Sequence, residues 1–128
     1  MNNNSTDMLR EMFKMREEFM KSLNEAFPGT YEKIPLDLFQ KKHQQICRDV
    51  ALKGVEEMFE ALQHLKNWKP HKKTEVKSFN KDEFLEEIVD AFNYFLTLII
   101  LTGFNENDLY ESYVKKDQII HERLKNEY

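Results

Sequence analysis

The sequence predicts an all-α fold, an antiparallel bundle of about four helices. Only 3 Gly and 3 Pro occur among the 128 residues, too few for the many turns of an all-β domain. Apolar residues recur at helical spacing in four segments, and no segment alternates convincingly in the way of a strand. A chain of this length has room for one domain with a marginal core. Residues 1–128 are therefore expected to form a single domain, completed by association into a homodimer or higher oligomer.

The composition limits the kinds of partner. Hydrophobic residues make up 41% and charged residues 33% of the chain, which excludes a disordered tail and fits a soluble protein. A net charge of −4 gives no overall basic field for nucleic acid, and the most apolar stretch, residues 91–101, is too short for a membrane span of about 20 residues. No nucleic acid and no membrane are expected as partners. The single cysteine, Cys47, fits a reducing cytoplasm and is expected to be buried.

The first helix is expected to begin at a cap, Thr6 or Asp7, and to end near Ala26. Residues 27–29, Phe-Pro-Gly, interrupt it. Residues 1–6 form a polar segment without a signal peptide and are expected to be flexible. The helix carries Met and Phe side chains that are expected to be core residues, namely Met8, Met12, Phe13, Met15, Phe19 and Met20.

The second helix is expected from about Leu36 to about Asn67, because apolar residues recur there at helical spacing. Gly54 lies inside it and costs roughly 1 kcal/mol against Ala, which indicates a packing role or a role at a site. Residues 68–79 (WKPHKKTEVKSF) are expected to form a basic loop.

The third helix is expected to begin after Asn80, because Asn80 and Glu83 have the spacing of a capping box. It is expected to extend to Thr102 and to stop at Gly103. From Phe92 onward this helix is apolar on nearly all sides, so it must be surrounded by other helices or by a second subunit. Four helices of one chain barely enclose this helix, so a second subunit in a homodimer is the favoured way to bury the rest of its apolar surface.

Two of these helices carry the same acidic pattern. Glu57 and Glu60 are separated by two apolar residues and followed by Ala, and so are Glu87 and Asp90. Carboxylates three residues apart lie on one helix face. The apolar residues between them are expected to face the core, so the acids should lie at the edge of the buried surface. One pair of acids at this spacing usually lies on a solvent-exposed helix face. Two matched pairs on consecutive helices favour a metal-binding or catalytic site.

Packed antiparallel, the two helices would bring the four carboxylates together across a helix contact of roughly 8–10 Å between axes. Like charges in a partly dry groove require bound protons or a cation. Carboxylate oxygens suit Mg²⁺, with Mn²⁺ a possible substitute. The small residues Gly54, Ala61 and Ala91 are expected to leave space for the ion and its waters.

A fourth helix is expected after the cap pattern of residues 105–108. Lys116 and Arg123 are two turns apart on it and share a face. A lysine and an arginine together are the usual pair for phosphate. The alternative role of these cations, complementing the helix dipole, is left open.

These motifs together resemble the all-α nucleoside triphosphate pyrophosphohydrolases, specifically the dimeric dUTPase branch that includes the T-even phage dCTPase–dUTPases, and more distantly MazG. The hallmark E-x-x-E followed by E-x-x-D is matched by the four acids, and the W-K-x-W-K motif by residues 68–72, with His71 in place of the second tryptophan. The C-terminal pattern Y-x-K-K-N-x-x-N-x-x-R-x-x-x-G-Y is matched in register by Tyr113, Lys116, Arg123 and Tyr128. The likeness covers approximately residues 45–128.

The resemblance implies a cytoplasmic enzyme, of a bacterium or a phage-infected cell, that uses Mg²⁺ to hydrolyse dUTP or dCTP to the monophosphate and pyrophosphate. It implies that the four acids are the catalytic metal ligands, one of which could also accept a proton from the attacking water. The implied substrate-binding residues, with help from Lys72 of the basic loop, are Lys116, Arg123, Tyr128, Trp68, Lys69 and Arg16. Trp68 would stack on the base or plug the end of the bundle, and Arg16 aligns with a glutamine that reads the pyrimidine.

The chain departs from this family pattern in its last helix. Asp117 and Ile120 stand where the pattern has asparagines, and Glu127 replaces its glycine. The isoleucine removes a polar contact to the ligand, which puts the pyrimidine specificity in doubt more than the chemistry. Two alternatives therefore stay open: a catalytically weakened nucleotide-binding protein of the same fold, and a purely structural helical dimer.

Overall fold

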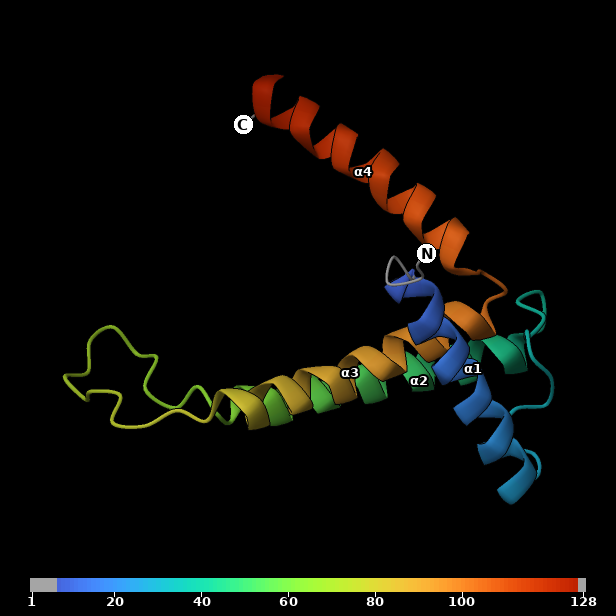
Figure 1. The fold of residues 1–128 in the computed structure, drawn as a ribbon, viewed down its shortest axis with the longest axis horizontal. Coiled ribbons are helices and arrows are strands. Elements are labelled where there is room, and N and C mark those ends of the chain that lie inside the picture. Colours follow the sequence, from blue (N-terminus) through green and yellow to red (C-terminus); the bar gives the residue numbers. More distant parts are fainter. Residues whose placement is uncertain (1–6, 127–128) are drawn as a thin grey trace, which may run out of the picture. The chain divides into compact units, whose positions relative to one another are not determined.

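A computed structural model describes residues 7–126, and these contain four α-helices and no strand. The helices are α1 (Met8–Ala26), α2 (Lys41–Leu62), α3 (Lys81–Leu101) and α4 (Glu106–Asn126) (Figure 1). The predicted all-α class is confirmed. The predicted flexible segment, residues 1–6, lies outside the described part of the chain.

The chain divides into two compact units. One comprises Met1–Leu36 together with Ile99–Tyr128, and the other comprises Asp37–Leu98. The first unit thus contains α1, the end of α3 and α4, and the second contains α2 and most of α3. Over the described residues, no helix combines the length and the hydropathy that crossing a bilayer requires.

Helix α1 has the predicted bounds. The carboxylate of Asp7 caps it by accepting a hydrogen bond from the backbone N–H of Arg10 at 3.1 Å. Phe13 and Met20, two turns apart on one face, are buried as predicted. The core prediction is wrong for the remaining Met and Phe positions, because one chain buries only one face of this helix. The exposed side chains are Met8, Met12, Met15 and Phe19.

Helix α2 is shorter than predicted at both ends. Residues before Lys41 are held in a turn, because the backbone N–H of Leu36 donates to the carbonyl of Leu101 at 2.8 Å and the carboxylate of Asp37 accepts from the N–H of Phe39. At the other end, the N–H groups of residues 63–65 bond to carbonyls three residues earlier, which tightens the chain and ends the helix at Leu62.

Local signals place both ends of α3 as predicted to within a residue. The side-chain oxygen of Asn80 accepts from the N–H of Glu83 at 3.1 Å. At the C-terminal end, the N–H of Gly103 donates to the carbonyl of Ile100, and the N–H of Phe104 donates to the carbonyl of Ile99. This is the Schellman arrangement, and Gly103 takes the positive φ of 91° that it requires.

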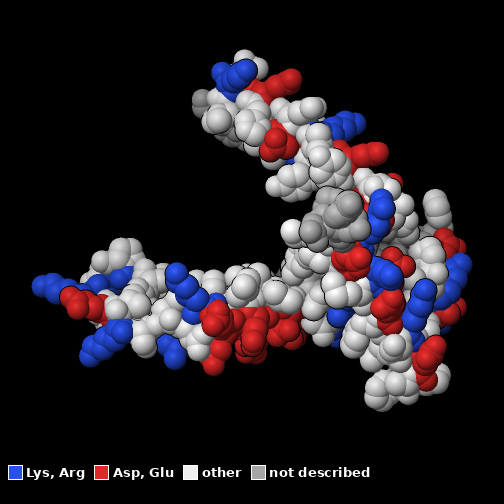
Figure 2. Space-filling model, viewed as in Figure 1, with Lys and Arg blue, Asp and Glu red and all other residues white. Residues whose placement is uncertain are grey.

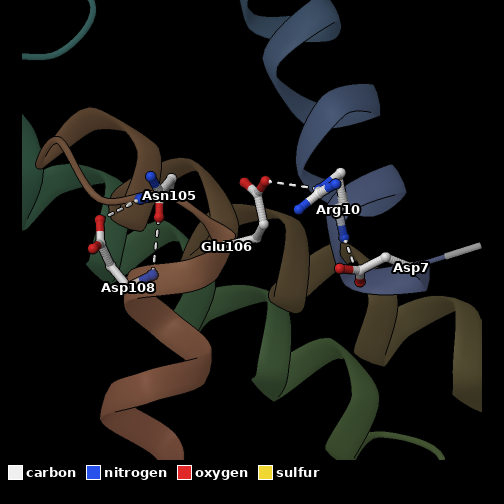
Figure 3. A network of polar contacts seen from close by, with 5 residues as sticks. All are labelled: Asp7, Arg10, Asn105, Glu106 and Asp108. Atoms are coloured by element: carbon white, nitrogen blue, oxygen red, sulfur yellow. Dashed lines mark hydrogen bonds and ion pairs between the residues drawn. The ribbon is translucent and has the colours of Figure 1, made fainter.

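Helix α4 begins at a complete capping box (Figure 3). The N–H of Asp108 donates to the side chain of Asn105 at 2.9 Å, and the N–H of Asn105 donates to the carboxylate of Asp108 at 3.0 Å. One residue into the helix, Glu106 pairs with Arg10 of α1 at 3.2 Å between Oε1 and Nε. No residue of α4 is buried along its described length, and the homodimer that would cover such a surface stays a prediction.

Helices α2 and α3 lie side by side (Figure 1). They pack closely where Gly54 of α2 meets α3. A Cβ built on this glycine would lie 2.9 Å from the ring of Phe95 and 3.2 Å from the Cβ of Tyr94. The role of Gly54 is therefore close packing of α3. The expectation that it leaves space for an ion is wrong, because the aromatic side chain of α3 fills that space.

Gly54→Ala is expected to lower the free energy of unfolding by roughly 1–3 kcal/mol, because overpacking at Phe95 outweighs the gain in helix propensity. Urea denaturation followed by circular dichroism measures the change. Adding Phe95→Leu to the variant should recover part of the loss, since it removes the ring. A stabilised Gly54→Ala protein would contradict this account of the packing.

Candidate metal and nucleotide site

Helices α2 and α3 run antiparallel through the acidic motifs. Gly54 faces Tyr94 and Phe95, whereas His64, further along α2, meets the earlier residue Phe84 in an edge-on ring contact with centroids 6.2 Å apart. Residue numbers therefore fall along α3 as they rise along α2. This register puts the acids of the two helices at the same level, as the sequence predicts.

Three of the four predicted acids converge. Glu57, Glu87 and Asp90 each offer one carboxylate oxygen, and these atoms all lie within 4.8 Å of one another. Glu57 and Glu87 are half-buried, and Asp90 is exposed. Glu60 is exposed and does not join this group, although it lies near enough to act on Glu57 electrostatically.

The electrostatics of Glu57 show how crowded the charges are. Partial burial raises the pKa of its carboxyl above the ordinary value of 4.5, and the carboxylates of neighbouring acids raise it further. In order of decreasing effect these neighbours are Asp90, Glu60, Glu87 and Glu56. A proton or a cation at this place relieves the repulsion.

The surroundings of the acids differ in part from the prediction. Of the apolar residues between the acids, Phe59 and Val89 are exposed instead of facing the core. Ala61 and Ala91 are fully buried, so they serve helix packing in the same way as Gly54. Room for an ion comes from the partly exposed position of the three carboxylates and not from these small residues.

The three carboxylates fit a divalent cation. Around an octahedral Mg²⁺ ion with bonds of roughly 2.1 Å, adjacent ligand oxygens are about 3 Å apart and opposite ones about 4.2 Å apart. Carboxylate oxygens within 4.8 Å of one another can reach these spacings if their side chains rotate toward a common ion. An all-oxygen donor set matches the preference of Mg²⁺ or Mn²⁺.

The predicted phosphate-binding cations lie on α4, in the other unit. Lys116 and Arg123 are exposed there, and Arg123 is in the last turn of the helix. Tyr128 lies outside the described residues. The role of these side chains at a site shared with the acids stays a prediction.

The remaining predicted binding residues are on the loop and on α1. Trp68 is 69% exposed, and the ammonium group of Lys69 lies 5.7 Å from the centroid of its ring. Trp68 therefore does not plug the bundle, and its ring is accessible for stacking. The guanidinium of Arg16 lies 4.7 Å from the ring centroid of Phe19 on the same helix.

Sequence reasoning missed the grouping of side chains in the loop. Lys66, Asn67 and Thr74 line a hollow together with Lys69 and Lys72, of which only the last two were expected to act. The sequence shows a local excess of lysine in this loop. Because the loop is irregular, the spacing of the lysines does not predict which of them lie side by side.

The described residues combine four α-helices with three carboxylates that could hold a metal ion on an antiparallel helix pair. Residues 73–128 match the model of a family described as dUTPase. The match supports the dimeric dUTPase-like all-α superfamily, and the resemblance is confirmed at that level; the T-even phage branch stays a prediction. No curated protein and no solved structure matches the chain.

The matched segment contains two of the three converging acids. Glu87 and Asp90 lie within it, as do Lys116 and Arg123, whereas Glu57 lies outside it. The convergence of Glu57 on the other two acids joins α2 to the matched segment through geometry alone.

The raised pKa of Glu57 has a consequence for stability. The folded chain holds this proton more tightly than the unfolded chain does, so the contribution of Glu57 to stability falls as the pH rises above 4.5. Glu57→Gln is expected to raise the melting temperature of the metal-free protein at neutral pH and to flatten its decline as the pH rises above 4.5. Thermal melts in EDTA across this range measure both effects. Glu86→Gln, which removes an acid of α3 outside the cluster, should leave the pH profile unchanged; an equal effect would mean that net charge alone is responsible.

Proposed function

We propose that this protein hydrolyses a deoxynucleoside triphosphate, with dUTP and dCTP as the leading substrates, to the monophosphate and pyrophosphate. A match to a dUTPase family suggests hydrolysis of nucleoside triphosphates as the reaction. The observation that carries the proposal is the convergence of Glu57, Glu87 and Asp90 within 4.8 Å, two of them inside the matched segment.

In the proposed reaction, Glu57, Glu87 and Asp90 would hold Mg²⁺, or Mn²⁺ in its place, with Glu60 as a further ligand that has to move toward them. When bound, the cation would neutralise charge on the triphosphate and make a nearby water more acidic. The exposure of Asp90 and Glu60 leaves the outer side of the cluster open to a phosphate chain. Buried carboxylates on both helices would have closed it.

Glu57 is the proposed proton acceptor. In the metal-free chain its pKa is raised by partial burial and by the adjacent carboxylates, which is the direction that a stronger base requires. Lys116, Arg123 and Tyr128 are proposed to bind the phosphates and to stabilise the leaving pyrophosphate.

The base is proposed to bind at Trp68, whose exposed ring offers a stacking surface, with Lys69 beside it and Arg16 as a polar contact. The alternative function is nucleotide binding with weakened turnover. One observation favours it: Ile120, at a position where the family pattern has asparagine, is 45% exposed on α4 and offers a ligand no hydrogen bond.

The wild-type protein is expected to release pyrophosphate, and not single phosphate, from at least one deoxynucleoside triphosphate in the presence of Mg²⁺. Asp90→Asn and Glu87→Gln should each lower kcat about 100-fold or more, because each removes a charged ligand while keeping its shape. Glu86→Gln is the matched control on α3 and should retain wild-type turnover. Tight binding without turnover would select the alternative function.

Lys116→Ala is expected to raise KM for the nucleotide about tenfold with little change in the melting temperature, because the side chain is exposed and binds phosphate as a point charge. Steady-state kinetics and a thermal melt measure the two quantities. Lys115→Ala, the adjacent exposed lysine, is the control and should alter KM by no more than about twofold. A large fall in melting temperature would assign Lys116 a structural role instead.

A further inference from the structure

Helix α1 exposes an apolar stripe beside the face that it buries. The stripe consists of side chains four, three and four residues apart, which lie on one side of a helix, namely Met8, Met12, Met15 and Phe19. Their exposed fractions run from 36% to 78%. The buried residues Phe13 and Met20 lie roughly 120° around the helix from the stripe, at about 100° per residue. The core of the chain therefore leaves the stripe uncovered.

Helix α4 carries a second stripe with the same spacing. Its positions 113, 117, 120 and 124 follow positions 8, 12, 15 and 19 of α1 by 105 residues each. Three of them hold exposed apolar side chains, namely Tyr113, Ile120 and Leu124. The fourth is Asp117, whose carboxylate pairs with His121 of the same helix at 3.3 Å. No described residue of α4 is buried, so this stripe also lacks a cover, and Figure 2 shows uncharged side chains exposed along α4 between acidic and basic ones.

Opposite charges flank the two stripes. Glu11 and Glu18 lie seven residues, about two turns, apart along one edge of the α1 stripe. Lys116 and Arg123, again 105 residues later, lie along the equivalent edge of the α4 stripe. Within residues 7–126, none of these four side chains lies within ion-pair distance of an opposite charge. The two helices therefore present complementary surfaces, an apolar stripe with an acidic edge and an apolar stripe with a basic edge.

Antiparallel docking matches these surfaces edge to edge. In two antiparallel helices that face each other through equivalent stripes, equivalent edges lie on the same side of the contact. With Met12 opposite Ile120, each glutamate lies within two residues, about 3 Å along the axis, of a cation on the other helix. Parallel docking would instead turn the basic edge of α4 toward the edge of α1 that carries Arg16. Charge therefore selects the antiparallel arrangement.

The α4 helix of the same chain does not provide this contact. The ion pair of Arg10 with Glu106, 3.2 Å between Nε and Oε1, holds the first turn of α4 beside the first turn of α1 (Figure 3). Leu124 lies 18 residues beyond Glu106, about 27 Å along α4. In the antiparallel arrangement, Leu124 lies opposite Met8, close to Arg10. A chain that holds Glu106 at Arg10 cannot also hold Leu124 there.

We propose that the exposed stripe of α1 is an interface for α4 of a second copy of this chain, docked antiparallel. Helices α1 and α4 belong to the same unit, so the contact can form twice in a dimer with a twofold axis. A second copy supplies both complementary surfaces, and flexible methionine side chains adapt to the apolar side chains that face them. Lys116 and Arg123 keep donors for a phosphate, because an ammonium group has three N–H donors and a guanidinium has five.

The test is the dissociation constant of the dimer, measured without nucleotide by analytical ultracentrifugation at low ionic strength. The wild-type protein is expected to form a dimer. Glu11→Lys/Glu18→Lys, and separately Lys116→Glu/Arg123→Glu, should each raise the dissociation constant about tenfold or more, because like charges then meet in both contacts. An equimolar mixture of the two variants should associate as the wild-type protein does, since both contacts of the mixed dimer then carry opposite charges.

The matched control is Glu111→Lys/Glu122→Lys, which makes the same change of charge on the exposed face of α4 opposite the stripe. Its dissociation constant should stay within about threefold of the wild-type value. Ile120→Lys tests the apolar part of the contact and should weaken the dimer about tenfold or more. Circular dichroism checks that each variant keeps its helix content.

Three outcomes would overturn the proposal. A dimer that tolerates both charge reversals uses another surface. Failure of the two reversed variants to associate on mixing shows that the charged edges do not meet. A monomeric wild-type protein leaves the stripe to α4 of the same chain if Glu11→Lys/Glu18→Lys lowers the melting temperature, and to a different protein if it does not. The measurement involves no nucleotide and no metal, so its result is independent of the proposed hydrolysis.

Discussion

The close antiparallel contact of α2 with α3 is the constraint on which the rest of the site depends. Gly54 lets the ring of Phe95 approach the backbone of α2, and this contact sets the register of the two helices. The same register brings Glu57 level with Glu87 and Asp90. Apolar packing thus holds carboxylates that repel one another close together. The raised pKa of Glu57 is the electrostatic consequence.

The sequence predicts features that local hydrogen bonds or repeated motifs determine. The caps at Asp7, Asn80 and Asn105 and the stop at Gly103 depend on side chains within a few residues. The convergence of the acids is predictable because the same motif appears on two consecutive helices. The start of α2 is not, because residue 36 is held by a bond to a carbonyl 65 positions later in the chain, between Leu36 and Leu101.

The spacing of residues in the sequence also does not predict which helix surfaces are buried or how the side chains of the loop are grouped. Helix α1 has apolar side chains on both faces, and the pattern does not reveal which face one chain buries. Small residues beside a carboxylate have two readings, space for an ion or close helix packing, and the structure assigns Gly54 to the second. The irregular loop has no periodicity at all, so the grouping of Lys66 with Lys72 follows only from coordinates.

The raised pKa of Glu57 makes cation binding at the acidic cluster depend on pH. A cation that binds between these carboxylates competes with protons for their oxygens. The concentration of free cation needed to fill the cluster therefore rises as the medium becomes more acidic. The enthalpy of cation binding measured by calorimetry therefore depends on the buffer that takes up any protons released.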